Sequence, residues 1–137
     1  MKKFLIIFFI LLDSKFLNAE TLIFKNCMNE NFNYDKNDYI LDLKEEIMTR
    51  EFIYNDDTYN KLRLNDISTK KNNTTTQRIS KVGNLFLSEI TGYPTFYTQL
   101  VFNETKKSIS IKTVLNNTEA ISLISKCKKT LRYKKQT

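Results

Sequence analysis

The sequence contains no histidine and no tryptophan, and it holds only two glycines and one proline. The missing histidine removes the commonest general base and the commonest metal ligand of proteins. Two glycines cannot supply a phosphate-binding loop, a dinucleotide-binding loop or the glycine-framed serine of many hydrolases. These absences predict a protein with no metal site, no cofactor and no familiar catalytic centre.

The one long apolar run lies at the N-terminus and has the layout of a secretory signal peptide. Lys2 and Lys3 precede nine apolar residues, and a polar segment then ends at Ala19. The run is far shorter than the ~20 residues that span a bilayer, so an uncleaved anchor is the less favoured alternative. We therefore predict cleavage between Ala19 and Glu20. The expected product is a soluble protein of the periplasm or the extracellular space.

The leader holds three lysines and one aspartate, so the 118 residues that follow it keep a net charge of +5. Cys27 and Cys127 are the only cysteines. In an exported chain, two cysteines most simply form one structural disulfide. The alternative is a reactive thiol pair, but there is no CxxC motif and no histidine to activate a thiolate.

The clearest local pattern lies in residues 95–114, where two runs alternate apolar and polar residues around the sequence NETK. Alternation with period two places every second side chain on the same face of a strand. A four-residue loop pairs Leu100 with Ile109 and gives a β-hairpin, with one face of residues 96–102 lining the core. The opposite face, which carries Tyr97, is expected to meet solvent.

Other short runs of the same kind predict strands at residues 21–27, 39–44, 47–54, 58–67, 78–82 and 85–90. Residues 68–77 are polar, so we expect a flexible loop or the tip of a long hairpin there. Residues 118–127 fit either a closing strand or a short helix. We favour the strand, because Cys127 must reach Cys27 in the first strand.

The count of eight or nine short strands predicts an all-β fold, an antiparallel meander closed as a small barrel. A β-sandwich is the alternative. Closure removes the exposed strand edges that promote aggregation. The expected organisation is a signal peptide at 1–19, a single barrel domain at 20–127 and a basic C-terminal tail at 128–137.

A leader, a cysteine in the first strand, a cysteine in the last strand and a β-meander between them resemble the small barrels of the bacterial periplasm. The lysozyme-inhibitor family of bacterial envelopes is one such group. The resemblance covers most of the chain after the leader and concerns architecture. It assigns no inhibitory residues here, because the family's SG…Y motif and its tryptophan-containing strand have no counterpart in this sequence.

Two groups of side chains are candidates for binding. The first is a basic cluster after the last acid, Glu119, and it consists of Lys126, Lys128, Lys129, Arg132, Lys134 and Lys135. Such a cluster is suited to an anionic phospholipid, lipopolysaccharide or another acidic envelope polymer, although a solvated tail is the simpler interpretation. The second is a pair of aromatic residues, Tyr93 and Tyr97, expected at the rim of the barrel and suited to a small apolar ligand.

Carboxylates are the remaining catalytic candidates, and those on or beside strands are Asp42, Glu51, Glu89 and Glu104. A pair of them would be needed for glycosidic chemistry, but charged residues usually lie on the surface. We therefore predict a non-catalytic exported barrel that binds a partner such as an envelope protein. A carboxylate-dependent hydrolase or lyase and a structural protein of the envelope are the alternatives. Nucleic acid is a poor partner for an exported protein.

Overall fold

The computed structural model describes residues 20–29 and 33–134. The predicted signal peptide at 1–19 and Lys135 of the predicted basic cluster lie outside the described residues. The elements are β1 (Glu20–Met28), β2 (Tyr34–Asp42), β3 (Ile47–Tyr54), α2 (Asp56–Asn65), β4 (Asn72–Val82), β5 (Leu85–Ser88), β6 (Thr91–Tyr93), β7 (Phe96–Asn103), β8 (Ser108–Leu115) and β9 (Thr118–Lys134).

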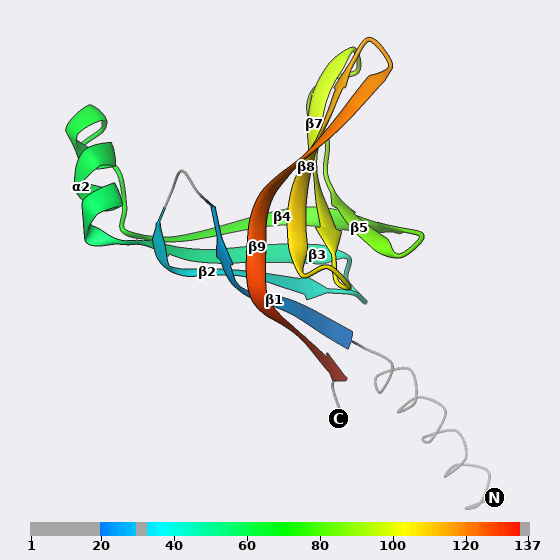
Figure 1. The fold of residues 1–137 in the computed structure, drawn as a ribbon, viewed down its shortest axis with the longest axis horizontal. Helices are drawn as coiled ribbons and strands as arrows, with labels where there is room; N and C mark the ends of the chain where they lie inside the picture. The colour runs from blue at the N-terminus through cyan, green and yellow to red at the C-terminus, as the bar shows by residue number, and fades with distance from the viewer. Residues whose placement is uncertain (1–19, 30–32, 135–137) are drawn as a thin grey trace, which may run out of the picture.

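Eight of the nine strands form a closed antiparallel barrel (Figure 1). Neighbours in the chain pair in sequence from β1 to β5, and again from β7 to β9. Two further pairings, β5 with β7 and β1 with β9, close the ring. Strand β6 pairs only with β7 and stays outside the ring. The predicted barrel is confirmed, and the sandwich alternative is wrong.

Strand β9 is 17 residues long and pairs with two different neighbours. Its first half pairs with β8, and its second half pairs with β1 from Lys126 to Lys134. The strand prediction for residues 118–127 is therefore confirmed over the short helix. The prediction of a basic tail is wrong over residues 128–134. These residues form backbone hydrogen bonds with β1, on the side of β1 that faces away from β2.

The interior of the barrel is filled by large apolar side chains. The residues buried most completely are Phe24, Phe102, Leu22, Leu41, Met48 and Ile109. The ring centroids of Phe24 and Phe102 lie 5.6 Å apart, and those of Tyr39 and Phe102 lie 5.3 Å apart. Rings at these distances contribute to stability beyond their buried area.

The predicted hairpin is present as β7 and β8, but its register differs by two residues. Leu100 pairs with Ile111 instead of Ile109, because the turn begins later. A shift of two residues keeps every side chain on its predicted face, so Phe102 and Ile109 still reach the core.

The expectation that the opposite face of this hairpin meets solvent is wrong at Val101 and Val114, which are 6% and 4% exposed. The end of β5 is hydrogen-bonded to β7 in this region. The Gln99 amide, on the same face as Val101, donates a hydrogen bond to the Ser88 carbonyl oxygen at 2.9 Å. The barrel is nevertheless closed, so burial at these two positions does not make the fold a sandwich.

The strand predicted at residues 58–67 is wrong, since residues 56–65 form the helix α2. Asn55 caps this helix by accepting a hydrogen bond from the Thr58 backbone N–H at 2.8 Å. Asp56 and Asp57 then lie in the first turn, where their charges favour a helix N-terminus. The polar stretch 68–77 is mainly strand, because β4 begins at Asn72.

Two parts of the sheet extend past the barrel (Figure 1). One consists of the ends of β2, β3 and β4 and carries α2 at its tip. The other, which we call the β7–β9 arm, consists of β6, residues 96–99 of β7, 112–115 of β8 and 118–123 of β9. Of the described residues, no helix is long and apolar enough to cross a membrane.

Candidate functional site

The β7–β9 arm carries an unusual number of exposed large apolar side chains. They are Ile90 just before β6, Tyr93, Phe96, Leu115, Ile121 and Leu123. Each of these side chains is at least half exposed. Single exposed apolar residues are normal on a protein surface, whereas a cluster on one element marks an interaction site.

Three of these side chains form a row across the tip of the arm. Tyr93 is the cross-strand partner of Phe96, and Phe96 is the partner of Leu115. Cross-strand partners point to the same face of a sheet, so the three side chains lie next to one another. They are 76%, 50% and 52% exposed. We call Tyr93, Phe96 and Leu115 the apolar row.

The local sequence explains how Tyr93 is brought against Phe96. The turn between β6 and β7 is so tight that a Cβ atom on Gly92 would lie 2.5 Å from the Phe96 carbonyl oxygen. Gly92 also has a φ of +125°, which side-chain-bearing residues rarely adopt. One of the two glycines of the chain is therefore required to build the apolar row.

Tyr93 and Tyr97, predicted to share a rim, lie on opposite faces of the arm. Tyr97 is the partner of Gly92, while Tyr93 is the partner of Phe96. Neighbouring positions along a strand point in opposite directions. The two tyrosines therefore do not line one ligand site, and Tyr93 belongs to the apolar row instead.

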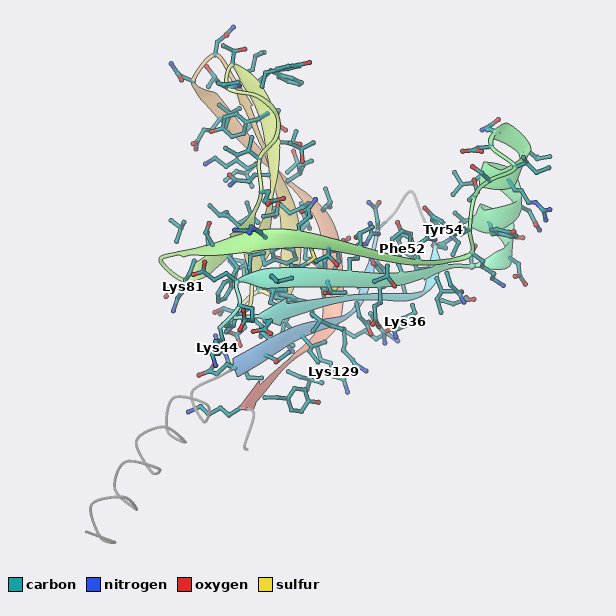
Figure 2. The ribbon with its side chains drawn as sticks, turned by 180° about the vertical axis from the view of Figure 1, so that it is seen from behind. Lys36, Lys44, Phe52, Tyr54, Lys81 and Lys129 are labelled. Carbon is teal, nitrogen blue, oxygen red and sulfur yellow. A yellow bond between two sulfur atoms is a disulfide. The ribbon has the colours of Figure 1, made fainter. Side chains whose placement is uncertain are left out.

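The basic residues of β9 divide into two groups. Lys126, Lys128, Lys129 and Lys134 are exposed and form no ion pair with any described residue. Figure 2 labels four lysines, Lys36, Lys44, Lys81 and Lys129, and they are spread over different parts of the barrel. The positive charge of the molecule is thus distributed, and β9 supplies one section of it.

Arg132, the fifth described member of the predicted basic cluster, is occupied within the molecule. Its guanidinium donates two hydrogen bonds of 2.8 Å to the Glu104 carboxylate and also bonds the Glu20 carboxylate. The hydrogen bonds from Arg132 hold the pKa of Glu104 below its usual value. Arg132 therefore links β9 to β1 and to the loop after β7, and it is not free to bind an anion.

The four catalytic candidates do not converge. Glu51 pairs with Lys36 at 2.9 Å and Glu104 pairs with Arg132. Asp42 accepts hydrogen bonds from the backbone N–H groups of Lys44 and Glu45, while Glu89 is exposed. No group of three or more potential metal ligands occurs in the described part of the chain. Asp42, Glu51 and Glu104 therefore have structural roles, whereas Glu89 is exposed and forms no ion pair with a described residue.

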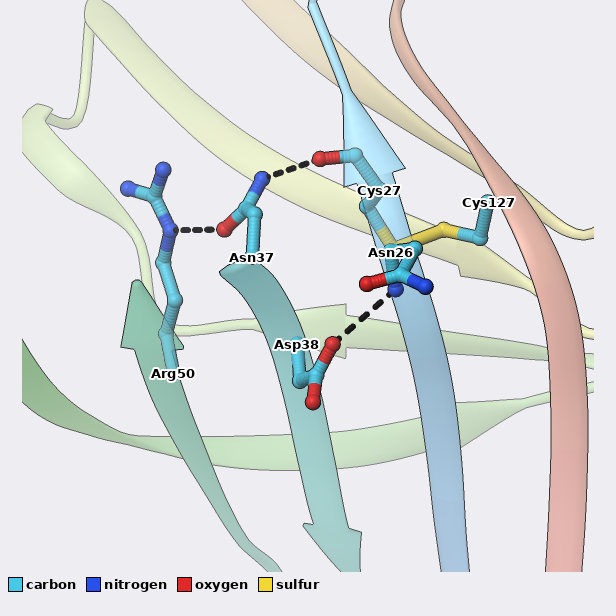
Figure 3. The surroundings of a disulfide bond; sticks show 6 residues. All are labelled: Asn26, Cys27, Asn37, Asp38, Arg50 and Cys127. Atoms are coloured by element: carbon cyan, nitrogen blue, oxygen red, sulfur yellow. Dashed lines mark hydrogen bonds between the residues drawn. A yellow bond between two sulfur atoms is a disulfide. The ribbon is translucent and has the colours of Figure 1, made fainter. Parts of the chain in front are cut away.

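A polar network that the sequence analysis missed surrounds the disulfide (Figure 3). The disulfide joins the cross-strand partners Cys27 and Cys127, as predicted. The Asn37 amide donates to the Cys27 carbonyl oxygen at 2.6 Å and accepts from Arg50 Nε at 3.0 Å. The Arg50 guanidinium lies 4.0 Å from the centroid of the Phe52 ring. Arg50 packs on an aromatic ring in the fold and is held there by Asn37.

The helix α2 is the second exposed feature. None of its residues is buried; Leu64 in its last turn is 87% exposed, and Ile67, two residues after the helix, is 81% exposed. These two residues line a shallow hollow of about 390 Å³ together with Asn60 and Arg63. Phe52 and Tyr54 lie at the end of β3 nearest α2 (Figure 2), and the ring of Tyr34 on β2 packs against both of them.

No family model matches the chain, and no curated protein or solved structure matches it.

Proposed function

We propose that this protein is an exported, non-catalytic binding protein that contacts a partner protein of the cell envelope through the apolar row. The observation that carries the proposal is the register that aligns Tyr93, Phe96 and Leu115 across three strands while leaving each at least half exposed. Aromatic residues of this kind dominate the energy of protein interfaces.

The filled barrel supports this choice of surface. Lipocalin-like proteins bind ligands inside the barrel, whereas here Phe24, Tyr39 and Phe102 occupy that space. The arm extends past the barrel, so a partner can reach the apolar row without any change in the core. The apolar row therefore suits a macromolecular partner better than a small ligand held within the barrel.

Site-specific photocrosslinking in producing cells tests the proposal. A photoreactive phenylalanine analogue at Phe96 should give a discrete crosslinked protein, and the same analogue at Ser80, an exposed position on β4, should not. The substitutions Tyr93→Ser and Leu115→Ser should remove the Phe96 adduct without lowering the melting temperature, because both side chains are exposed. Equal labelling from Phe96 and Ser80 would contradict the proposal.

Export has its own test. The mass of the secreted form should correspond to a chain that begins at Glu20 and is lighter by two hydrogens because of the Cys27–Cys127 bond. A mass that retains residues 1–19 would contradict cleavage after Ala19.

The exposed lysines of β9 support a second candidate function, binding to an anionic envelope polymer or lipid. Lys126, Lys128, Lys129 and Lys134 are free of ion pairs within the described residues. Each lysine near an anionic surface contributes about 1 kcal/mol. Replacement of all four by glutamine should abolish sedimentation with vesicles of anionic phospholipid, while Arg132→Gln should leave it unchanged if the protein stays folded.

A further inference from the structure

The first half of β9 has a free edge in the described structure. Strand β8 pairs with one side of residues 118–123, and pairing with β1 on the other side begins only at Lys126. A free edge presents unpaired N–H and C=O groups, and these can pair with a strand from another chain. Nothing in the described residues forms a strand beside this part of β9.

The turn before β9 shows which backbone groups face the free edge. Asn116 and Asn117 both have positive φ, 48° and 67°, as in a two-residue type I′ turn. The flanking residues Leu115 and Thr118 then exchange hydrogen bonds with each other, and such pairs alternate along the strands. The N–H and C=O groups of Glu119, Ile121 and Leu123 therefore point away from β8, towards the free edge.

The side chains of this edge lack the features that usually block strand pairing. Residues 118–123 include no lysine, arginine or proline. Glu119, the one charged residue, is neutralised by Lys112 at 3.0 Å. Ile121 and Leu123 point to the same face and are 62% and 55% exposed. This combination is what proteins avoid on a strand edge that stays in solvent.

Two other free edges among the described residues are protected, one by polar side chains and one by its short length. Residues 72–77 of β4 are unpaired on one side, but their side chains are all asparagine, threonine or glutamine. The outer edge of β6 is three residues long and is followed by Pro94.

We propose that the free edge of β9 pairs with the same edge of a second copy of this chain, antiparallel about a two-fold axis at Ser122. In this register Ile121 lies opposite Leu123 of the second copy, and Leu123 lies opposite Ile121 of the second copy. The outward-facing backbone groups of both residues then meet, which gives four hydrogen bonds at the centre. Four exposed apolar side chains become a single patch on one face.

The self-complementary sequence identifies a second copy as the occupant. Antiparallel partners related by a two-fold axis must share a face, and Ile121 and Leu123 satisfy this condition with each other. No like charges meet at the centre of the pair, because residues 120–124 carry no charged side chain. The proposal uses the edge of β9 and the face that carries Ile121, so it does not depend on the apolar row.

Analytical ultracentrifugation of the exported protein tests the association. We expect a reversible dimer whose fraction rises with protein concentration. The variant Ile121→Lys/Leu123→Lys should weaken dimerisation at least 10-fold and keep the melting temperature, since both side chains are exposed. The matched control is Leu115→Lys, which is on the opposite face of the same arm and should dimerise like the wild type.

A cysteine variant tests the register. Ser122→Cys should form an intermolecular disulfide in the dimer, because Ser122 faces its own copy across the axis in a closely spaced pair. Thr74→Cys, on the protected edge of β4, is the control and should crosslink at the background rate. A protein that remains monomeric throughout, or a dimer that Ser122→Cys does not crosslink above the control, would overturn the proposal.

Discussion

Arg132 joins three segments that are far apart in the sequence. Its guanidinium bonds Glu20 at the start of β1 and Glu104 in the loop between β7 and β8. The contact between Arg132 and Glu104 uses two nitrogens and two oxygens, which is the strongest geometry for such a pair. Both partners remain partly exposed, so solvent reduces the energy of the interaction.

This ion pair predicts a dependence of stability on pH. The folded-state pKa of Glu104 is lowered, first by the hydrogen bonds from Arg132. A lowered pKa contributes stability that is present above the unfolded value of 4.5 and is lost as the pH falls through the folded value. Glu104→Gln should therefore lower the free energy of unfolding by about 0.5–1 kcal/mol at pH 7 and by much less near pH 3.

Urea unfolding at both pH values measures this difference. Glu89→Gln is the control, because Glu89 is exposed and forms no ion pair with a described residue. If Glu104→Gln destabilised the protein equally at pH 7 and pH 3, the carboxylate charge would have no role in the effect.

Residue-scale features differ in how far the sequence predicts them. The disulfide follows from the predicted leader and from the count of two cysteines, since two cysteines allow one pairing within the chain. The engagement of Arg132 does not follow, because it requires the exact register that places Arg132 beside a loop 28 residues earlier. The contacts of Arg50 with Asn37 and Phe52 cannot be predicted from the sequence either. An arginine in a strand is ordinarily expected to face solvent, and only the folded sheet shows which side chains lie beside it.

At the scale of elements, α2 shows how a local pattern can mislead. Leu62 and Leu64 alternate with charged residues, as in a strand with one buried face. A strand of this kind would need a neighbouring layer against which to bury its apolar face. This segment has no such layer beside it, since no residue of α2 is buried. The cap at Asn55 and the two aspartates after it then decide the structure, because local signals prevail where packing is absent.

The same absence of packing predicts that the barrel does not need α2. The Tyr54 N–H already bonds the Lys71 carbonyl oxygen at 3.0 Å, so the chain can turn between these residues. Replacement of residues 55–70 by Asn-Gly should change the free energy of unfolding by less than about 0.5 kcal/mol. Thermal unfolding followed by circular dichroism measures this change.

A single-site variant separates the helix from the rest of the molecule. Asn55→Ala should increase hydrogen exchange within α2 and leave the exchange of the barrel strands unchanged. If the chain with Asn-Gly in place of residues 55–70 lost more than about 2 kcal/mol in its free energy of unfolding, α2 would instead support the sheet.

The arm illustrates a second limit of sequence patterns. Alternation correctly assigns Phe96 to the face of Phe102, and this prediction of the face is confirmed by the pairing. Alternation alone places Phe96 in the core, but the barrel ends near Leu100 and Phe96 is 50% exposed. Strand periodicity shows which face of the sheet a residue occupies. How much of that face is buried depends on the tertiary fold.

At the scale of the whole molecule, the disulfide crosses the seam where the first and last strands meet. It closes a loop with a sequence separation of 100 residues. Both cysteines are buried in the core, and β1 has no other strand on that side. The covalent bond therefore reinforces the one pairing that joins the two ends of the meander.

Replacement of both cysteines, Cys27→Ser/Cys127→Ser, should lower the free energy of unfolding by about 2–5 kcal/mol. Guanidinium unfolding measures the loss, and the reduced wild-type protein should reproduce most of it. A double variant that lost less than about 1 kcal/mol would mean that the β1–β9 pairing is stable without the bond.

The position of the seam also has a consequence for how the chain acquires its structure. Strand β1 is made first, yet its partner β9 is made last, and bringing such distant segments together costs about 4 kcal/mol of loop-closure entropy. Pairings of this kind are slow to form, so β1 stays open on one side while the rest of the meander assembles. A chain that stops before Lys126 has no means to seal the ring, and it is exposed to proteases as an incomplete product.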